Sequence, residues 1–287
     1  APASLDYEAG GARFLRPTSL DEALALRAAH PTAVVLAGGT DLVVDVNQVG
    51  TRNSGWIALG AIAELRRIEE RADRFVIGAL ATWTDLEERL AARVPLFADV
   101  IPLFASPLIR ARATIGGNLA TASPVGDGAP VLLALDAQVE LAAATGRHTA
   151  ALADFFTGYR RTALRADELL ASVHVPRPLP EVARFYKVSK RELDDIAGVS
   201  GAFAVWRDGG VVTKARLAFG GVAATPVRAM AAERELVGRR LDAGSLASCQ
   251  RAAVAAFTPI DDVRASAAYR TAMVASLLAK FWHEVAP

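Results

Sequence analysis

An amphipathic pattern opens the chain. Apolar residues recur at every third or fourth position from Leu20 to Ala28, which is the spacing of one helix face. Ser19 precedes this stretch and Glu22 lies three positions later, a combination typical of a capping box at a helix start. Pro31 then ends the stretch, because proline cannot continue a helix. The pattern predicts one short helix.

Apolar runs without this spacing predict strands. AVVLA (33–37) is apolar, contains β-branched residues and is followed by two glycines, so we expect a buried strand. The runs GWIALGAI (55–62) and RFVIGA (74–79) are further strand candidates. A helix is expected from about residue 84 to 92, with Thr82 or Thr84 as its cap. Together with the first helix, these elements predict a small α/β unit.

The middle of the chain, from about Pro95 to Pro176, mixes the two patterns. A short buried helix is expected after Pro130, followed by strands over Gln138–Ala142 and Glu168–Val175. PRPLP (176–180) is the densest proline cluster in the chain. It is therefore the best candidate for a domain boundary.

The last third changes character. Apolar and polar residues alternate on both sides of Asp208-Gly209-Gly210, which is a strong signal for a β-hairpin. Helical patterns follow in RAMAAERELVG, with Gly238 as its C-cap, in SLASCQRAAVAAF and in SAAYRTAMVASLLAKFWHEV. Strands followed by helices predict an α+β domain with helices packed on an antiparallel sheet.

Composition and charge argue against several functions. The 287 residues carry a net charge of +1 with both signs interspersed, which argues against a nucleic-acid partner. The apolar runs fall short of the roughly 18–20 residues that span a bilayer. Cys249 is the single cysteine, so the chain can form no internal disulfide and cannot supply the roughly four thiolates of an iron–sulfur cluster. The four histidines show no metal-ligand spacing, and no metal site is expected.

The start of the chain, APASLDYEAGG, has neither the basic nor the apolar region of a signal peptide. It also has no initiator methionine, so we expect a chain that was processed or that belongs to a longer polypeptide. The low cysteine count fits a reducing compartment.

The first candidate site is the strand-then-glycine sequence VVLAGGTDLV. Gly38 and Gly39 directly follow the expected strand, and Thr40 and Asp41 come next. Without Cβ atoms, two glycines let the backbone approach an anion closely, and successive N–H groups can form an anion-binding nest. The motif is neither GxGxxG nor a Walker loop, so neither standard nucleotide fold is indicated. A tight turn is the alternative explanation of the local pattern.

A second glycine pair lies in ATIGGNLATASPVGD (113–127). Gly116 and Gly117 stand among small polar residues, and the centre of the stretch holds no large side chain. This composition suits backbone contacts to a polar ligand better than it suits a core strand. The two segments together predict a long phosphate-bearing ligand more strongly than either does alone, because such a ligand needs donors from several loops.

Combined, AGGTDL and TIGGNLATASPVGD resemble the FAD-binding module of the molybdenum hydroxylases, the xanthine dehydrogenase family, and most of all the small subunit of bacterial xanthine dehydrogenases. FFTGYRRTAL, FYKVSKRELDDIA, LAFGGVAATPVRA and PIDDVRASAAYR follow in the family's order, so the resemblance covers essentially the whole chain. It implies an α+β fold in which two α/β subdomains clasp an FAD and an α+β domain of antiparallel sheet plus helices follows. We therefore expect an FAD-binding domain over residues 1–176, with its two subdomains meeting near residue 93, and a C-terminal flavoprotein domain over residues 181–287.

The resemblance also implies cofactor contacts. The first segment would wrap the FAD pyrophosphate, the second would complete the phosphate cradle, and Phe104 would be an aromatic contact. Asp194 and Ile196 fall where the family places a loop over the flavin ring, and no side chain is expected to act as a catalytic acid or base. The full set of expected cofactor contacts is Val35, Leu36, Ala37, Gly38, Gly39, Thr40, Asp41, Leu42, Phe104, Ala113, Thr114, Ile115, Gly116, Gly117, Asn118, Thr121, Asp127, Leu169, Leu170 and Lys187.

Structural roles compete with some of these assignments. Asp41 and Asp127 are also typical turn residues, and Phe104 is a typical core residue. Arg160 and Arg161 are expected to be surface or interface charges. The four tryptophans are expected in the core or at interfaces, namely Trp56, Trp83, Trp206 and Trp282.

The function that the resemblance implies is electron transfer inside a larger, cytoplasmic oxidoreductase of the xanthine dehydrogenase type. Electrons from a substrate oxidised at a molybdenum site would pass through iron–sulfur clusters to FAD in this chain and then to NAD. Molybdopterin and the iron–sulfur clusters would lie on partner chains, namely a molybdenum-cofactor-binding large subunit and an iron–sulfur subunit, or on a missing N-terminal part.

Two departures from the xanthine dehydrogenase pattern support a second hypothesis. They are Thr40-Asp41 in the first segment and the run KRELDDIA near the flavin. The second hypothesis is the flavin subunit of another molybdenum hydroxylase, acting on an aldehyde, an N-heterocycle, carbon monoxide or an aromatic thioester. A flavin-free assembly protein with the same fold is the rival from another functional class.

Overall fold

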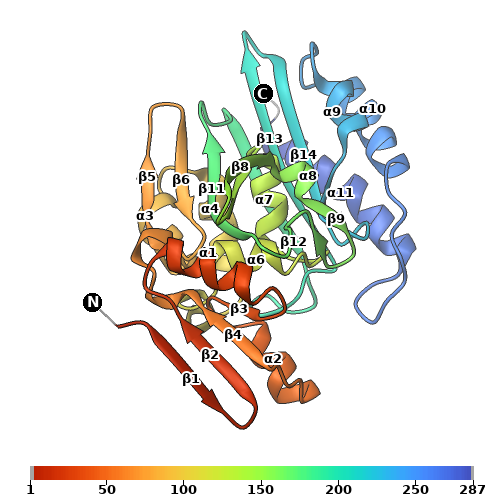
Figure 1. Ribbon diagram of the computed structural model, residues 1–287. Helices are drawn as coiled ribbons and strands as arrows, with labels where there is room; N and C mark the ends of the chain where they lie inside the picture. Colours follow the sequence, from red (N-terminus) through yellow and green to blue (C-terminus); the bar gives the residue numbers. More distant parts are fainter. Residues whose placement is uncertain (1–2, 286–287) are drawn as a thin grey trace.

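The computed structural model describes residues 3–285 and shows three larger sheets with helices between and beside them (Figure 1). The first sheet has four strands in the order β1-β2-β4-β3. β1 pairs antiparallel with β2, whereas β2, β4 and β3 run parallel to one another. Its strands are β1 (Leu5–Ala9), β2 (Ala12–Arg16), β3 (Val34–Leu36) and β4 (Gly55–Ala58).

Helix α1 (Leu20–Ala29) packs between the first sheet and the second. Ser19 Oγ accepts a hydrogen bond from Glu22 N, as the capping pattern predicted, but the Glu22 carboxylate accepts from Thr18 N rather than from Ser19 N. Leu20 of α1 shares a buried cluster with Leu169 of the second sheet. Short helical turns follow the other two parallel strands. After β3 come α2 (Leu42–Val44) and the π-helical turn η1 (Asp45–Val49), and after β4 come the 3-10 turns η2 (Leu59–Ala61) and η3 (Ala63–Arg66).

The second sheet is antiparallel, with the strand order β5-β6-β11-β7-β8. Its strands are β5 (Ile68–Glu70), β6 (Arg74–Gly78), β7 (Gln138–Ala143), β8 (Gly146–Ala151) and β11 (Leu169–Pro176). Between β8 and β11 along the chain, β9 (Phe156–Gly158) and β10 (Arg161–Thr162) form a separate two-stranded ribbon. The chain changes from the first sheet to the second between residues 58 and 68, so this change does not coincide with the boundary near residue 93 expected from the sequence. The difference arises because the partner of β6 is β11, far along the chain, and local pattern cannot reveal that pairing.

Short helices connect the strands of this sheet. They are α3 (Trp83–Leu90), α4 (Pro95–Val100), the 3-10 turn η4 (Ile101–Leu103), α5 (Pro107–Arg110), α6 (Ile115–Ala120), α7 (Gly128–Ala134) and α8 (Leu152–Phe155). Of the two caps considered for α3, the structure selects Thr82, whose Oγ1 accepts from Asp85 N at 3.0 Å. The Asp85 carboxylate accepts from Thr82 N in return, which completes a capping box.

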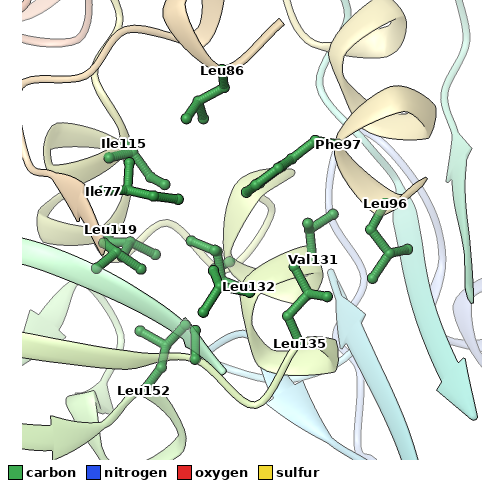
Figure 2. Close-up of a cluster of buried hydrophobic side chains, with 14 of the residues drawn as sticks. Ile77, Leu86, Leu96, Phe97, Ile115, Leu119, Val131, Leu132, Leu135 and Leu152 are labelled. Carbon is green, nitrogen blue, oxygen red and sulfur yellow. The ribbon is translucent and has the colours of Figure 1, made fainter. Parts of the chain in front are cut away.

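The main hydrophobic core joins these helices to the second sheet (Figure 2). Figure 2 shows Ile115 and Leu119 of α6 beside Ile77 of β6, in one cluster with Leu86 of α3 and Leu132 of α7. All five side chains are fully buried. Since burying one such side chain contributes about 1.5–3 kcal/mol, α6 is held tightly in place. The second glycine segment, which contains α6, is therefore part of the core.

The C-terminal part forms the third sheet, in the antiparallel order β12-β13-β14-β15. The expected hairpin is confirmed, with Gly209 and Gly210 both at positive φ between β13 and β14. Figure 1 shows the helices of this part beside the sheet, on the side away from the first sheet. The elements are β12 (Val182–Val188), β13 (Val199–Asp208), β14 (Val211–Gly220), β15 (Val227–Arg228), α9 (Met230–Leu236), α10 (Ala243–Ala255) and α11 (Ala267–Val285).

The third sheet is covered on both faces. Phe203 and Phe219 on one face belong to a cluster with Phe281 of α11, whereas Ala202 and Ala218 belong to the main core. The expected α+β fold is thus confirmed. Of the tryptophans, Trp83 and Trp282 are buried, and Trp56 and Trp206 are half-buried.

An ion-pair group ties the middle of the chain to the third sheet. Asp136, which follows α7, lies 2.9 Å from Lys214 Nζ, 2.9 Å from Arg216 Nε and 3.3 Å from Arg228 Nη1. Burial acts to raise the pKa of Asp136, but the hydrogen bonds and charges of Arg216 and Lys214 outweigh it and lower the pKa to about 2. The carboxylate therefore stays ionised at neutral pH.

Candidate cofactor site

The two glycine segments lie against each other. Gly38 follows β3, and a Cβ atom placed on it would lie 2.0 Å from the carbonyl oxygen of Arg112 and 3.2 Å from the Cα of Ala113. Backbone atoms cannot be approached so closely by a side chain, so only glycine fits at this position. Arg112 and Ala113 lead directly into Thr114, the first polar residue of the second segment. The fold therefore brings together two segments that are far apart in the sequence.

The first segment presents its backbone donors without internal partners. Among residues 3–285, no backbone acceptor takes a hydrogen bond from the N–H groups of Gly38, Gly39, Thr40 or Asp41. Gly39 has φ +78, a left-handed conformation that glycine tolerates, and its carbonyl accepts from Val43 N at 2.9 Å. Consecutive N–H groups around a left-handed residue form an anion-binding nest. The segment is built to bind an anion.

A cavity of about 160 Å³ opens where the two segments meet. Two threonines, Thr82 and Thr114, and two arginines, Arg66 and Arg112, are among its lining residues. Hydroxyl and guanidinium groups are typical ligands of phosphate oxygens. The remaining lining residues are Ala37, Gly38, Gly60, Leu80 and Ala111.

The sequence pattern missed several of these lining residues. The sequence could have indicated Arg112 as a site residue, since it directly precedes the predicted cofactor-binding run that starts at Ala113. For Thr82, the sequence pattern predicts only a role as a helix cap. Arg66 and Gly60 had no such signal, because they reach the cavity through the turns η2 and η3 that follow β4.

The second segment, in contrast, uses its backbone donors inside the protein. Ile115 N donates to Ala81 O at 3.0 Å and Gly116 N to Ala79 O at 2.9 Å. Gly117 N donates to Thr114 Oγ1 at 3.1 Å, with Thr114 as the N-cap of α6. This segment is a rigid wall of the site, and the amides of Ile115, Gly116 and Gly117 are already satisfied.

The two glycines of the second segment have different surroundings. A Cβ on Gly116 would lie 2.6 Å from the Cβ and 2.7 Å from the carbonyl oxygen of Ala79, so Gly116 is required by packing. A Cβ on Gly117 would approach only Thr114 Oγ1, at 2.9 Å. Gly117 is half-buried, and space remains on its outer side.

Asp127, at the end of the second segment, forms a buried ion pair with Lys187 of β12. Lys187 Nζ donates to Asp127 Oδ2 at 2.6 Å and to Leu103 O at 2.9 Å, and the two side chains are 3% and 10% exposed. Burial raises the pKa of Asp127 to about 6, although the Lys187 charge acts to lower it. The other carboxylate oxygen, Oδ1, is buried and has no hydrogen-bond partner within residues 3–285.

Further unpartnered polar atoms surround Gly128, the residue after Asp127. A Cβ on Gly128 would lie 2.4 Å from Asn118 Oδ1 and 2.6 Å from the Trp83 ring. Asn118 Oδ1 and Trp83 Nε1 are both buried without a partner in the described part of the chain. Phe104 stacks on Trp83 with ring centroids 4.1 Å apart. Buried polar atoms without partners are uncommon in proteins, so a group of three indicates a place where another molecule completes the hydrogen bonding.

The other expected contact residues are distributed around this site. Val35 and Leu36 are half-buried in β3, Ala37 follows them, and Leu42 begins α2. Thr121 Oγ1 donates back to Gly117 O at 2.9 Å, so this hydroxyl is bound within α6 and its C-cap. Leu169 and Leu170 are buried side chains that belong to two different core clusters. The residue after them, Ala171, accepts from Ala79 N, and Ala79 O accepts from Gly116 N, so this part of β11 is linked to the second segment.

Asp194 and Ile196 lie on a separate exposed loop, residues 189–197, called the 189–197 loop below. Asp194 has φ +52, and Ile196 is 47% exposed. Asp195, between them, accepts hydrogen bonds from Arg191 N and Ile196 N. The exposed Arg160 lies 3.9 Å from the Asp41 carboxylate, and Arg161 is exposed as well.

Two protein families match consecutive stretches of the chain. The "FAD binding domain in molybdopterin dehydrogenase" matches residues 8–178, and the "CO dehydrogenase flavoprotein C-terminal domain" matches residues 184–285. The chain belongs to the FAD-binding family of the molybdenum hydroxylases.

Members of this family match along most of the chain. The nicotinate dehydrogenase FAD-subunit of Eubacterium barkeri is 36% identical over 238 residues, which cover 79% of this chain and 80% of that protein. Xanthine dehydrogenase of Emericella nidulans is 32% identical over 95% of this chain, which spans only 21% of that longer protein. Among solved structures, reconstituted CO dehydrogenase from Oligotropha carboxidovorans contains a chain with a TM-score of 0.89 and 31% identity, covering 96% of this chain and 97% of that one.

The geometry fits the cofactor that the family name specifies. The unpartnered amides of the first segment and the cavity beside them suit a pyrophosphate, and the buried polar atoms around Asp127 suit a further polar part of the same ligand. Within residues 3–285, no group of three or more His, Cys, Asp or Glu side chains could hold a metal ion. In the same part of the chain, no helix combines the length and the apolar character needed to cross a membrane.

Proposed function

We propose that this chain holds FAD between its two glycine segments and relays electrons in a molybdenum hydroxylase complex of the xanthine dehydrogenase type. The observation that carries the proposal is the contact of Gly38 with Arg112. Gly38 lines a cavity shared with threonines and arginines, and it begins a run of four amides without a backbone acceptor within residues 3–285. FAD supplies a carrier that exchanges electrons with one-electron and two-electron partners alike. The residues of this chain bind it, orient it and control solvent access.

The proposal gives the residues separate tasks. The amides of Gly38 to Asp41 bind the pyrophosphate, with Thr114 and Arg66 nearby. Arg112 and Ala113, which lead into the wall formed by Thr114–Asn118, fix the position of the first segment through their contact with Gly38. Asp127, held by Lys187, and Asn118 accept hydrogen bonds from the polar part of FAD that reaches α7, because an amide oxygen and an ionised carboxylate oxygen are hydrogen-bond acceptors. Asp194 and Ile196 would lie over the flavin ring, and Phe104, Leu169 and Leu170 would provide apolar contacts.

The rest of the electron path lies outside this chain. Its single cysteine cannot ligate an iron–sulfur cluster, so clusters and molybdopterin belong to an iron–sulfur subunit and a molybdenum-cofactor-binding large subunit, or to another part of a longer polypeptide. NAD is the proposed final acceptor, and the cytoplasm is the proposed compartment. We also propose that the chain divides into an FAD-binding domain, residues 1–176, and a C-terminal domain, residues 181–287.

A second candidate is the FAD subunit of a nicotinate or carbon monoxide dehydrogenase. It is favoured by two relatives that the chain matches over most of both lengths, a nicotinate dehydrogenase FAD-subunit and a carbon monoxide dehydrogenase medium chain. Reduction assays separate the two candidates, because each complex reduces its flavin with its own substrate. Xanthine, nicotinate and carbon monoxide should be compared on the native complex, with NAD as acceptor.

The experiment that tests FAD binding is visible absorbance of the purified chain, before and after incubation with FAD. We expect a flavin spectrum that survives gel filtration. A colourless protein that stays colourless after added FAD would support the flavin-free assembly protein and remove the proposal.

A substitution tests the part that the second segment plays. Gly117→Val should abolish FAD retention while the protein stays folded, because the proposal takes the backbone at Gly117 to lie close to the pyrophosphate and the branched side chain would prevent that approach. Gly158→Val is a matched control, since the nearest atom to a Cβ there is 3.9 Å away, on the Arg161 side chain. Flavin content equal to that of the control would show that the second segment has a structural role only.

A further inference from the structure

Arg270, near the start of α11, is a buried cation that no step of the proposed function uses. Its side chain is 2% exposed. Nη1 donates to the carbonyl oxygens of Gly198 and Gly221 at 2.7 and 2.6 Å, and Nη2 donates to Asp262 Oδ1 at 2.7 Å. Burying a guanidinium group is costly unless its donors find acceptors. Arg270 therefore holds three separate segments of the chain in one arrangement, two through backbone carbonyls and the third through the Asp262 carboxylate.

The first of these segments is the base of the 189–197 loop. Gly198 N donates to Val188 O at 2.8 Å, so Val188 and Gly198 close the loop. Val188 directly follows Lys187, the partner of Asp127. By binding the carbonyl of Gly198, Arg270 fixes the end of the loop that carries Ile196.

The second segment connects Arg270 to the cofactor site. Gly221 has φ +80, and a Cβ on it would lie 2.3 Å from Gly198 O and 3.0 Å from Arg270 Nη1. Gly221 N donates to Pro124 O at 2.8 Å, and Pro124 lies in the second glycine segment, shortly before Asp127. The loop base, the end of β14 and the cofactor segment thus meet around one guanidinium group.

The third segment is the exposed turn 258–266. Asp262 Oδ1 accepts from Arg264 N and Ala265 N as well as from Arg270. Burial acts to raise the pKa of Asp262, but these hydrogen bonds outweigh it and lower the pKa. Lys190 Nζ of the 189–197 loop donates to Val263 O at 3.2 Å, which links the loop and the turn a second time.

We propose that Arg270 is a positioning residue that fixes the 189–197 loop relative to bound FAD and so controls solvent access to the flavin. The inference rests on the proposed function, because it takes the loop to lie over the flavin ring. Arg270 is bonded to the loop base and not to the first segment, so its loss leaves the pyrophosphate donors in place. FAD is retained in that case, while the protection of the flavin changes.

The test compares Arg270→Met, Arg270→Lys and Asp262→Asn with the wild-type, FAD-loaded chain. Arg264→Met is the matched control. Arg264 lies in the exposed turn that carries Asp262, and its side chain makes no hydrogen bond or ion pair in the described part of the chain. The measurements are amide hydrogen exchange over residues 189–199 and iodide quenching of flavin fluorescence. For Arg270→Met we expect exchange to rise by about tenfold, because bonds to a charged donor are lost at the loop base. Iodide quenching should rise with it, and Arg270→Lys and Asp262→Asn should show smaller increases of both.

The possible results separate the two claims. If Arg270→Met does not fold, Arg270→Lys and Asp262→Asn carry the test, because both keep the buried cation. Exchange and quenching equal to those of Arg264→Met would overturn the inference. Raised exchange without raised quenching would also overturn it, because Arg270 would then be structural only. If wild-type protein binds no FAD, the proposed function itself has failed.

Discussion

The two glycine segments look alike in sequence, yet the structure gives them opposite roles. Gly38 and Gly39 precede amides that find no backbone acceptor within residues 3–285, whereas the amides of Ile115, Gly116 and Gly117 are all bound internally. The first segment follows a half-buried strand at one side of the molecule, and the second begins a helix whose side chains fill the main core. A ligand therefore completes the backbone hydrogen bonding of the first segment, whereas the amides of Ile115, Gly116 and Gly117 are bonded before any ligand arrives. This difference predicts which substitutions act on folding and which act on FAD.

The largest effect is expected in the second segment. Gly116→Val should lower the free energy of unfolding of the FAD-free protein by about 4 kcal/mol or prevent folding, since its side chain must displace the backbone of Ala79. Urea unfolding followed by tryptophan fluorescence measures this. Gly117→Val is the control, because its Cβ meets only the Thr114 hydroxyl. Equal stability of the two variants would contradict a core role for Gly116.

A smaller effect, dependent on pH, is expected at Asp127. Its pKa in the folded protein is raised to about 6 from 3.8, so the folded state binds more protons than the unfolded state between these values. Stability contributed by this group is therefore present at low pH and declines as the pH rises through this window. In the FAD-free protein the decline should amount to about 2 kcal/mol between pH 4 and 7.

Asp127→Asn should remove this part of the pH dependence. Urea unfolding at several pH values measures the slope, and Asp154→Asn, at an exposed position, serves as the control. A wild-type slope that persists unchanged in Asp127→Asn would mean that Lys187 compensates fully for the burial of the carboxylate.

The smallest effect on folding, and the clearest on the ligand, is expected in the first segment. Gly39→Ala places a side chain at φ +78, which costs about 1 kcal/mol of stability. It should also weaken FAD binding by about fivefold, because the nest must distort to relieve the strain. Gly50→Ala is matched to it, since Gly50 has φ +74 and open space around it. FAD affinity is measured by fluorescence titration. If Gly39→Ala and Gly50→Ala lose stability alike and bind FAD alike, the first segment has no special role in FAD binding and its contrast with the second segment fails.

Much of the local structure follows from the sequence alone. The β-hairpin at Gly209-Gly210, the helix that Thr82 caps and the strand before Gly38 were all predictable, because turn residues, caps and apolar periodicity act over a few positions. The family was predictable as well, since both glycine motifs stand intact in the expected order. What these patterns missed was the change of sheet after β4, which depends on pairing between β6 and β11.

For the cofactor site, too, some features follow from the sequence and others only from the tertiary structure. The sequence by itself determined that two glycine segments exist and that each permits close backbone approach. Only the tertiary structure decided that Gly38 rests on Arg112, that Gly116 serves packing, and that Lys187 of β12 forms an ion pair with Asp127. The physical reason is that a glycine's role depends on which atoms occupy the space its missing side chain leaves, and a carboxylate's role depends on its partner and burial. Both are set by contacts between residues that are distant along the chain.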